Sequence, residues 1–256
     1  MTPQPEIARS LLIDGLGKGL RVIEQFSDAH PRLTATETGK LVGLTRTAAR
    51  RYLASLVHFG YADTDGKHYW LTPAILRLGQ SYLEAARLPR LVRPFLQHLS
   101  MRTGETANLS VLDGHEVVYL ARSNSPRVLS IGFHVGARMP AHIVSPGFAI
   151  LSTFGEAEFE AWMQAHDFGR FTGFTITDPE QFRASVAVAR RQGYWLAEQY
   201  SDIGLRGIAA PVFDRQGRCV GAVSMTFQAQ MYPDEKASAA LLPALREVVQ
   251  QVREVI

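Results

Sequence analysis

Apolar residues recur with helical spacing in a short segment near the amino terminus. Between Ala49 and Val57 they fall every three or four residues, which is typical of a helix with one buried face. A preceding helix is expected from about Thr36 to the residue before Gly43, because glycine readily adopts the left-handed conformation that ends a helix. The hydroxyl of Thr45 can cap the second helix. The pattern therefore predicts two short helices joined by a tight turn.

A β-hairpin is predicted directly after the second helix. Gly60 ends that helix, and an Asp-Gly pair at 65–66 separates segment 61–64 from segment 67–71. Asp-Gly favours a two-residue turn, because both central positions of such a turn have positive φ. Helix, turn, helix and hairpin in this order predict a winged helix-turn-helix domain over residues 9–72.

Amphipathic helices are also expected on both sides of this motif. The helix that opens the domain is predicted between residues 11 and 26, with a buried stripe of Leu16, Leu20, Ile23 and Phe26 and with Val22 beside it. After the hairpin, Thr72 and Pro73 have the residue types of an N-cap and a first helical position. They predict a linker helix over residues 73–88, which Pro89 separates from a further helix over 90–102.

From Gly104 the apolar period changes from helical to alternating. Strands are expected over residues 106–112, 116–121, 128–133, 194–198, 207–213 and 218–227. Helices are expected over residues 146–154, 156–166, 179–192 and 233–256. Strands and helices mixed with hairpins predict an α+β fold with a largely antiparallel sheet. We assign residues 89–256 to this second domain.

The excess of positive charge lies entirely in the first part of the chain. Residues 1–80 hold 10 Lys and Arg against 7 Asp and Glu, whereas residues 81–256 hold 17 of each kind, so the formal net charge of +3 belongs to the winged-helix part. Binding to nucleic acid requires charge of this sign. The excess is small, so it supports the motif and does not replace it.

The second short helix carries side chains suited to a DNA major groove. The candidate contacts at its amino-terminal end are Thr45, Arg46, Thr47, Arg50 and Arg51. Guanidinium groups neutralise phosphates or bind guanine, and small hydroxyls permit a close approach. At the hairpin tip, Lys67 and His68 are expected to reach a phosphate or the minor groove. Solvated arginines on a surface helix are the alternative interpretation.

Five segments of this half resemble the DNA-binding domain of IclR-type transcriptional regulators: 16–26, 43–53, 60–61, 69–73 and 78–79. Arg50-Arg51 and Lys18-Gly19 are similar to the branch that controls the catabolism of aromatic acids such as protocatechuate and 4-hydroxybenzoate. The resemblance implies that the linker helix also helps to form a dimer.

One predicted strand has the composition of a pocket wall. Along residues 218–227, alternation places Cys219, Val223, Met225 and Phe227 in the core and Ala222, Ser224 and Thr226 on the opposite face. Small and hydroxyl-bearing side chains leave room and offer hydrogen bonds to a small molecule. The alternative is that these side chains face solvent.

The second domain resembles the effector-binding domain of the same family, which is related to GAF-type ligand sensors, over segments 138–147, 193–194 and 204–212. The resemblance implies a pocket between these segments and strand 218–227. The candidate ligand-binding residues are Arg138, His142, Ser145, Arg206, Ser224 and Thr226. Ser145 stands at an expected helix start, where free backbone N–H groups favour a carboxylate. His142 has the alternative of a purely structural role.

The chain departs from the family pattern in this region. Residues 143–148 replace small residues followed by Gly-Lys or Gly-Arg, Gly207 stands where many members have Cys or Ser, and residues 199–201 replace acidic positions. These differences make the pocket bulkier in one place and emptier in another, so they leave the effector's identity open.

No motif predicts a metal site, a cofactor or catalysis. The histidines show no HxH or HExxH spacing, no Gly-x-Ser-x-Gly segment occurs, and the glycine-rich segment 15–19 follows no predicted strand. The single cysteine, Cys219, permits no intrachain disulfide. Without a recognisable signal peptide or membrane-spanning segment, we expect a cytoplasmic protein with no membrane partner.

Two functions remain as hypotheses. The first is a homodimeric or homotetrameric transcription factor that binds double-stranded operator DNA and responds to a small organic acid, with aromatic acids among the candidates. The second is a ligand-sensing interaction module without sequence-specific DNA binding. A mobility-shift assay with genomic DNA fragments distinguishes them.

Overall fold

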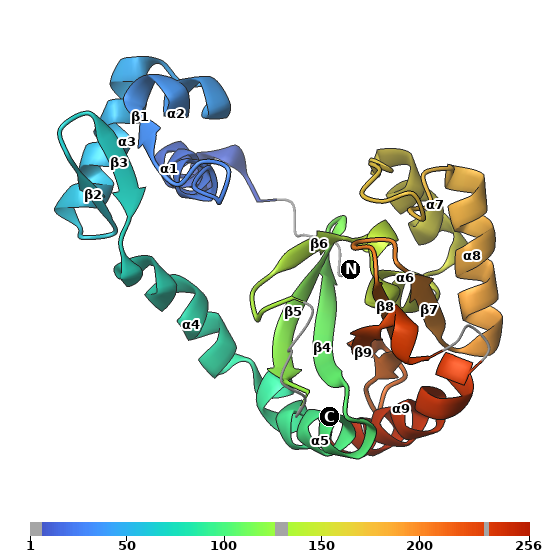
Figure 1. The fold of residues 1–256 in the computed structure, drawn as a ribbon. Helices are drawn as coiled ribbons and strands as arrows, with labels where there is room; N and C mark the ends of the chain where they lie inside the picture. Colours follow the sequence, from blue (N-terminus) through green and yellow to red (C-terminus); the bar gives the residue numbers. More distant parts are fainter. Residues whose placement is uncertain (1–6, 126–132, 233–235) are drawn as a thin grey trace. The chain divides into compact units, whose positions relative to one another are not determined.

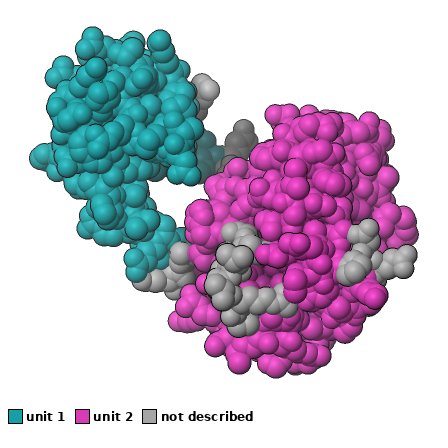
Figure 2. All heavy atoms as spheres, in the orientation of Figure 1, with its two compact units in different colours: residues 1–82 teal, residues 83–256 magenta. Residues whose placement is uncertain are grey.

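The computed structural model describes residues 7–125, 133–232 and 236–256. The chain divides into two compact units, Met1–Tyr82 and Leu83–Ile256, which Figure 2 colours separately. Among the described residues, no helix combines the length and the apolar character that crossing a membrane requires.

The first unit is a winged helix-turn-helix, as the apolar pattern predicts (Figure 1). Its elements are α1 (Asp14–Glu24), β1 (Leu33–Thr34), α2 (Ala35–Val42), α3 (Arg46–His58), β2 (Ala62–Thr64) and β3 (His68–Leu71), preceded by a 3-10 turn at Arg9–Leu11. The three strands form an antiparallel sheet in the order β1-β3-β2. The pairing of the two-residue strand β1 with the hairpin was not predicted, because so short a segment shows no alternation.

Local capping signals fix the helix-turn-helix geometry. Gly43 ends α2 in the left-handed conformation with φ 68°, and the hydroxyl of Thr45 accepts a hydrogen bond from the backbone N–H of Ala48 at 3.2 Å. Both features confirm the sequence interpretation. The cap of α2 lies earlier than expected, at Thr34, whose side chain and that of Glu37 form a reciprocal capping box.

The expected buried stripe of the first helix is wrong in part. Val22 is fully buried, but Leu16 and Leu20 are 64% and 46% exposed. The glycine-rich segment explains the difference. Gly15 and Gly19 lie one turn apart on α1, and a Cβ at either position would stand 3.7 Å from the Tyr52 side chain of α3. The absence of side chains on this face lets Tyr52 pack closely against α1, so the leucines turn outward.

The connection between the units differs from the prediction at two residues. A 3-10 turn at Pro73–Ile75 leads into α4 (Leu76–Ala85), and α5 (Arg87–Thr103) follows. Thr72 does not cap this turn, because its hydroxyl donates to the carbonyl of Gly60 instead. Pro89 does not separate the helices; it occupies the third position of α5, where its missing N–H is not required.

The second unit is built on a six-stranded antiparallel sheet in the order β6-β5-β4-β9-β8-β7. Its strands are β4 (Thr106–Asp113), β5 (Glu116–Ser123), β6 (Arg138–Pro140), β7 (Trp195–Glu198), β8 (Leu205–Phe213) and β9 (Cys219–Gln228). These results confirm the α+β fold with an antiparallel sheet. The strand expected over 128–133 lies, except for Phe133, outside the described residues.

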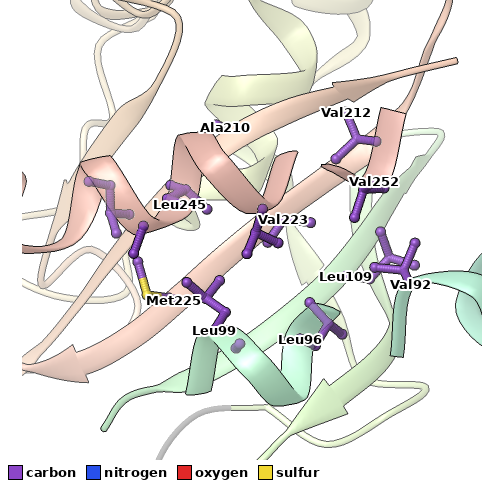
Figure 3. Close-up of a cluster of buried hydrophobic side chains, with 14 of the residues drawn as sticks. Val92, Leu96, Leu99, Leu109, Ala210, Val212, Val223, Met225, Leu245 and Val252 are labelled. Carbon is purple, nitrogen blue, oxygen red and sulfur yellow. The ribbon is translucent and has the colours of Figure 1, made fainter. Parts of the chain in front are cut away.

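Each face of the sheet is covered by different helices (Figure 1). Helices α5 and α9 (Lys236–Val255) cover one face, where Leu96, Leu99 and Leu245 pack against Leu109, Val223 and Met225 (Figure 3). Helix α6 (Ser145–Leu151) packs on the other face through Ala149 and Ile150, which contact Ala209 and Ala222. Helices α7 (Glu156–Ala165) and α8 (Pro179–Gln192) enclose a second core on that side.

The expected core position of Cys219 is wrong, because β9 contains an irregularity. The pairing between β8 and β9 shifts after Val212, and Gly221 adopts φ 151°. The shift moves Cys219 to the face of Ala222, where it packs in the small cluster beneath α6. Val223, Met225 and Phe227 occupy the α5/α9 core as predicted.

Candidate nucleic-acid interface and small-molecule cavity

The outer face of α3 is basic and exposed. Thr45, Arg46, Thr47, Arg50 and Arg51 are all exposed, whereas Ala49 and Leu53 on the inner face are fully buried. Within the described parts of the chain, no carboxylate forms an ion pair with these three arginines. Their charge is therefore available to a negatively charged partner.

A groove runs beside this face. Its volume is about 230 Å³, and it is lined by Ala48, Arg51, Tyr52 and Ser55. Tyr52, which packs beside the glycines of α1, and Arg51 both line this groove. A guanidinium at the edge of such a groove can contact a phosphate oxygen.

The hairpin tip carries a negative charge that the sequence interpretation did not weigh. Lys67 is exposed, but His68 Nδ1 lies 3.2 Å from the Asp65 carboxylate. The backbone N–H groups of His68 and Lys67 donate to Asp65 Oδ1 at 2.7 and 2.9 Å and hold the pKa of that carboxyl well below its usual range. Asp65 of the same turn therefore fixes the His68 ring. Lys67 is the exposed cation at the hairpin tip.

A cavity opens between the sheet and α6 in the second unit. Its volume is about 30 Å³. Its lining combines aromatic, aliphatic and hydroxyl-bearing residues: Tyr119, Phe133, Ile143, Val144, Ser145, Pro146, Ala197, Tyr200, Ser201, Leu205, Arg206, Gly207, Ser224 and Thr226. An apolar lining with a few convergent polar groups is typical of a small-molecule site.

Four of the six predicted ligand-binding residues line this cavity: Ser145, Arg206, Ser224 and Thr226. Ser145 is the first residue of α6 and makes no capping bond, and a Cβ at Gly207 would stand 2.7 Å from its Oγ. The glycine at this family position therefore leaves the space that Ser145 and a ligand can use. Helix α6 has only 7 residues, so the expected role of its N-terminus carries little weight.

Arg206 is among the cavity-lining residues, but its guanidinium is paired with other groups of the chain. Alternation along β8 places Gly207 on the cavity face and Ile208 in the α5/α9 core. The Arg206 side chain therefore leaves the strand on the α5/α9 face. Its guanidinium pairs with Glu198 at 2.6 Å and donates to the Tyr232 carbonyl at 2.8 Å. The Glu198 carboxylate therefore neutralises this arginine.

Arg138 does not lie at the cavity, which corrects the sequence expectation. It is exposed on β6 and forms ion pairs with Asp113 at 2.8 Å and Glu116 at 2.7 Å. The order of the sheet places β6 beside β5, so this side chain fastens the β4–β5 hairpin to β6. The family resemblance singled out Arg138 but did not reveal that Asp113 and Glu116 form ion pairs with it.

His142 also lies outside the cavity lining, in a chain of three histidines. It is fully buried and donates from Nε2 to the Gly169 carbonyl at 2.8 Å, so its Nδ1 accepts a hydrogen bond from His166 Nε2 at 2.8 Å. His166 Nδ1 lies 3.2 Å from His115 Nδ1. Burial lowers the pKa of His142, and burial together with the two neighbouring histidines lowers the pKa of His166 to about 3. These features support the structural alternative for His142.

Sequence reasoning missed the aromatic lining, chiefly Tyr119, Phe133 and Tyr200. Two signals pointed toward part of it. Residues 143–148 and 199–201 depart from the family pattern, and Ile143, Tyr200 and Ser201 prove to line the cavity. No group of His, Cys, Asp and Glu that could hold a metal occurs among the residues that the structure describes.

Comparison with known proteins agrees with this arrangement. Residues 15–66 match the family model of the IclR helix-turn-helix domain, and residues 80–254 match that of the bacterial transcriptional regulator IclR C-terminal domain. The p-hydroxybenzoate hydroxylase transcriptional activator of Acinetobacter baylyi is 37% identical over 98% of this chain and 94% of its own length.

Two solved structures are similar to this chain and contain aromatic acids. An IclR homolog from Microbacterium hydrocarbonoxydans, complexed with 4-hydroxybenzoate, has a TM-score of 0.74 and 27% identity and covers 94% of this chain and 98% of its own. The inducer-binding domain of the Acinetobacter PobR transcription factor, a double mutant with 3-hydroxybenzoic acid, has a TM-score of 0.63 and 32% identity over 67% of this chain and all of its own. With both of its domains matched, the chain belongs to the IclR family of bacterial transcriptional regulators.

Proposed function

We propose that this regulator responds to an aromatic carboxylic acid that binds in the cavity of the second unit. The observation that carries the proposal is the lining, where Tyr119, Phe133 and Tyr200 offer ring contacts beside the hydroxyls of Ser145, Ser224 and Thr226. A flat ring with polar substituents needs this combination. The aromatic acids in two similar solved structures support the same class of ligand.

Ligand binding would require the cavity to widen. The cavity volume of about 30 Å³ is less than a benzoate ring needs. Residues 199–201 between β7 and β8 form the wall that would have to shift, because the close approach of Gly147 to Ala141 holds α6 in place. A ligand that stabilises a widened cavity differs in affinity between two conformations, and regulation requires that difference.

DNA would be bound through the amino-terminal end of α3. Thr45 caps α3, Arg46 and Thr47 begin it, and Arg50 and Arg51 follow on the exposed side. We assign them to the major groove and Lys67 with His68 to the flanking phosphates or minor groove, with Lys67 the stronger contact. A duplex target would place the protein in the cytoplasm.

A second copy of the chain is the proposed partner of the exposed apolar side chains on the first unit. Leu11, Leu12, Ile13, Leu16 and Leu20 are exposed on and before α1, and Leu76, Leu78 and Tyr82 are exposed on α4. Apolar patches of this kind mark protein interfaces. A homodimer, or a homotetramer of two dimers, would read a palindrome with half-sites about a helical turn or more apart.

The variant Ser224→Leu tests the cavity. Leucine adds a branched side chain to a wall residue that is only 2% exposed, so it fills the space a ring would occupy. We expect calorimetry to show at least about a hundredfold weaker binding of 4-hydroxybenzoate, the scale of an overpacked site. Ser224→Ala is the matched control and should change affinity by less than about tenfold, the scale of one hydrogen bond. Normal binding by the leucine variant would exclude this cavity as the site.

A further inference from the structure

A buried amide lies on β4, the strand between the two cavity-lining strands β5 and β9. Asn108 on β4 is fully buried, and its Oδ1 has no hydrogen-bond partner within the described part of the chain. Its Nδ2 makes a single long contact of 3.5 Å to the hydroxyl of Thr226. A buried polar group without a partner is unfavourable, so each one in a native protein requires an explanation, and a bound ligand is one that supplies the missing partner.

Strand order and register place this amide on the cavity side of the sheet, directly behind the lining residues Ser224 and Thr226. Tyr119 of β5 and Ser224 and Thr226 of β9 line the cavity, and β4 lies between those two strands. Asn108 is directly opposite Ser224 in the register of β4 and β9. Its neighbours Ala107 and Leu109 point into the α5/α9 core, so alternation directs Asn108 to the cavity side.

We infer that Asn108 binds a hydroxyl group of the effector and thereby selects hydroxylated aromatic acids over unsubstituted ones. This inference rests on the proposed function of the cavity. A hydroxyl both donates and accepts, so it satisfies the free atom of the amide in either orientation of the amide plane. A carboxylate can only accept hydrogen bonds, and an unsubstituted ring edge can neither donate nor accept one. An acid without the hydroxyl leaves the amide buried and unpaired, which is how polar sites reject analogues.

Calorimetry on the full chain with benzoate, 3-hydroxybenzoate and 4-hydroxybenzoate tests the inference. The wild type should bind the preferred hydroxybenzoate about ten- to a hundredfold more tightly than benzoate, the scale of one buried hydrogen bond. Asn108→Leu and Asn108→Ala should lose this preference while binding benzoate about as tightly as the wild type. Leucine matches asparagine in shape and removes an unpaired buried group, so the first variant should fold at least as stably.

Ser110→Ala is the matched control. Ser110 is also fully buried on β4 without a hydrogen-bond partner in the described chain, but it stands opposite Ala222 rather than a cavity hydroxyl. This variant should keep the wild-type preference. A wild type that binds benzoate and both hydroxybenzoates equally, or Asn108 variants that keep the preference, would overturn the role of Asn108 and leave the cavity assignment intact. No binding of any of the three acids would overturn the proposed effector class and this inference together.

Discussion

Replacing both Arg46 and Arg51 with alanine is expected to weaken specific DNA binding by roughly a hundredfold or more, because each arginine that forks onto a base contributes about 1–3 kcal/mol. Both side chains are exposed on α3, and within the described residues no carboxylate forms an ion pair with either of them. Fluorescence anisotropy with an operator selected from random-sequence DNA measures the loss.

The matched control removes the same charge from another place. Arg90 and Arg93 are exposed on α5 in the second unit, so Arg90→Ala with Arg93→Ala lowers the net charge equally. This control should keep affinity within about threefold, which is a typical surface effect. The dependence on salt separates the two kinds of contact, because each lost phosphate contact reduces the slope of log affinity against log salt by about 0.9. Equal losses of DNA affinity in both double variants would show that net charge alone accounts for the effect, and would contradict direct contacts between α3 and the bases.

Replacing Gly147 with alanine is expected to destabilise the second unit by at least about 3 kcal/mol, a large part of the about 5–15 kcal/mol available to a folded protein. Gly147 lies in α6, and a Cβ there would stand 1.9 Å from the carbonyl oxygen and 2.6 Å from the carbonyl carbon of Ala141. The backbone at Gly147 and at Ala141 is buried, so moving either segment to make room would be energetically unfavourable. Urea unfolding followed by tryptophan fluorescence measures the loss, since Trp162 and Trp195 both lie in this unit.

Gly155→Ala is the control for the effect of removing a glycine. Gly155 precedes α7 with φ −63°, and a Cβ there meets nothing within 4 Å. Its substitution should cost about 1 kcal/mol or less, the difference between glycine and alanine as an N-cap. Similar unfolding curves for the wild type and the Gly147 variant would show that α6 can shift away from Ala141, and the close approach would then not fix the cavity wall.

The sequence predicted those parts of the fold that rest on neighbouring residues. Gly43 and Thr45 define the turn of the helix-turn-helix through their own conformation and hydroxyl, so their roles were readable without any tertiary contact. The exposure of Leu16 and Leu20 could not be predicted in this way. Which face of α1 is buried depends on Tyr52, which lies more than thirty positions later in the chain. The Tyr52 ring packs against the face of α1 where Gly15 and Gly19 carry no side chain.

The cavity shows the same limit more strongly. Ser224 and Thr226 were predicted because alternation along one strand separates small polar from large apolar residues. Arg138, His142 and Arg206 were expected to add charge, yet acidic groups pair with both arginines and His142 belongs to a histidine chain. A sequence shows which residues carry charge but not which partners neutralise it. Asn108 was missed because its position on the cavity side of the sheet follows only from the register of β4 with β9.

The binding of operator DNA by the full-length wild type, with and without 4-hydroxybenzoate, tests the central claim most directly. Anisotropy titrations with the selected operator should show an affinity that changes by at least about fivefold, in either direction, when the acid is added, which is the usual lower range of coupling between two sites. The Ser224→Leu variant should bind the same operator with an affinity that the acid does not alter. If random-sequence selection yields no preferred site, or if the acid leaves wild-type affinity unchanged, the account of a regulator controlled by an aromatic acid is contradicted.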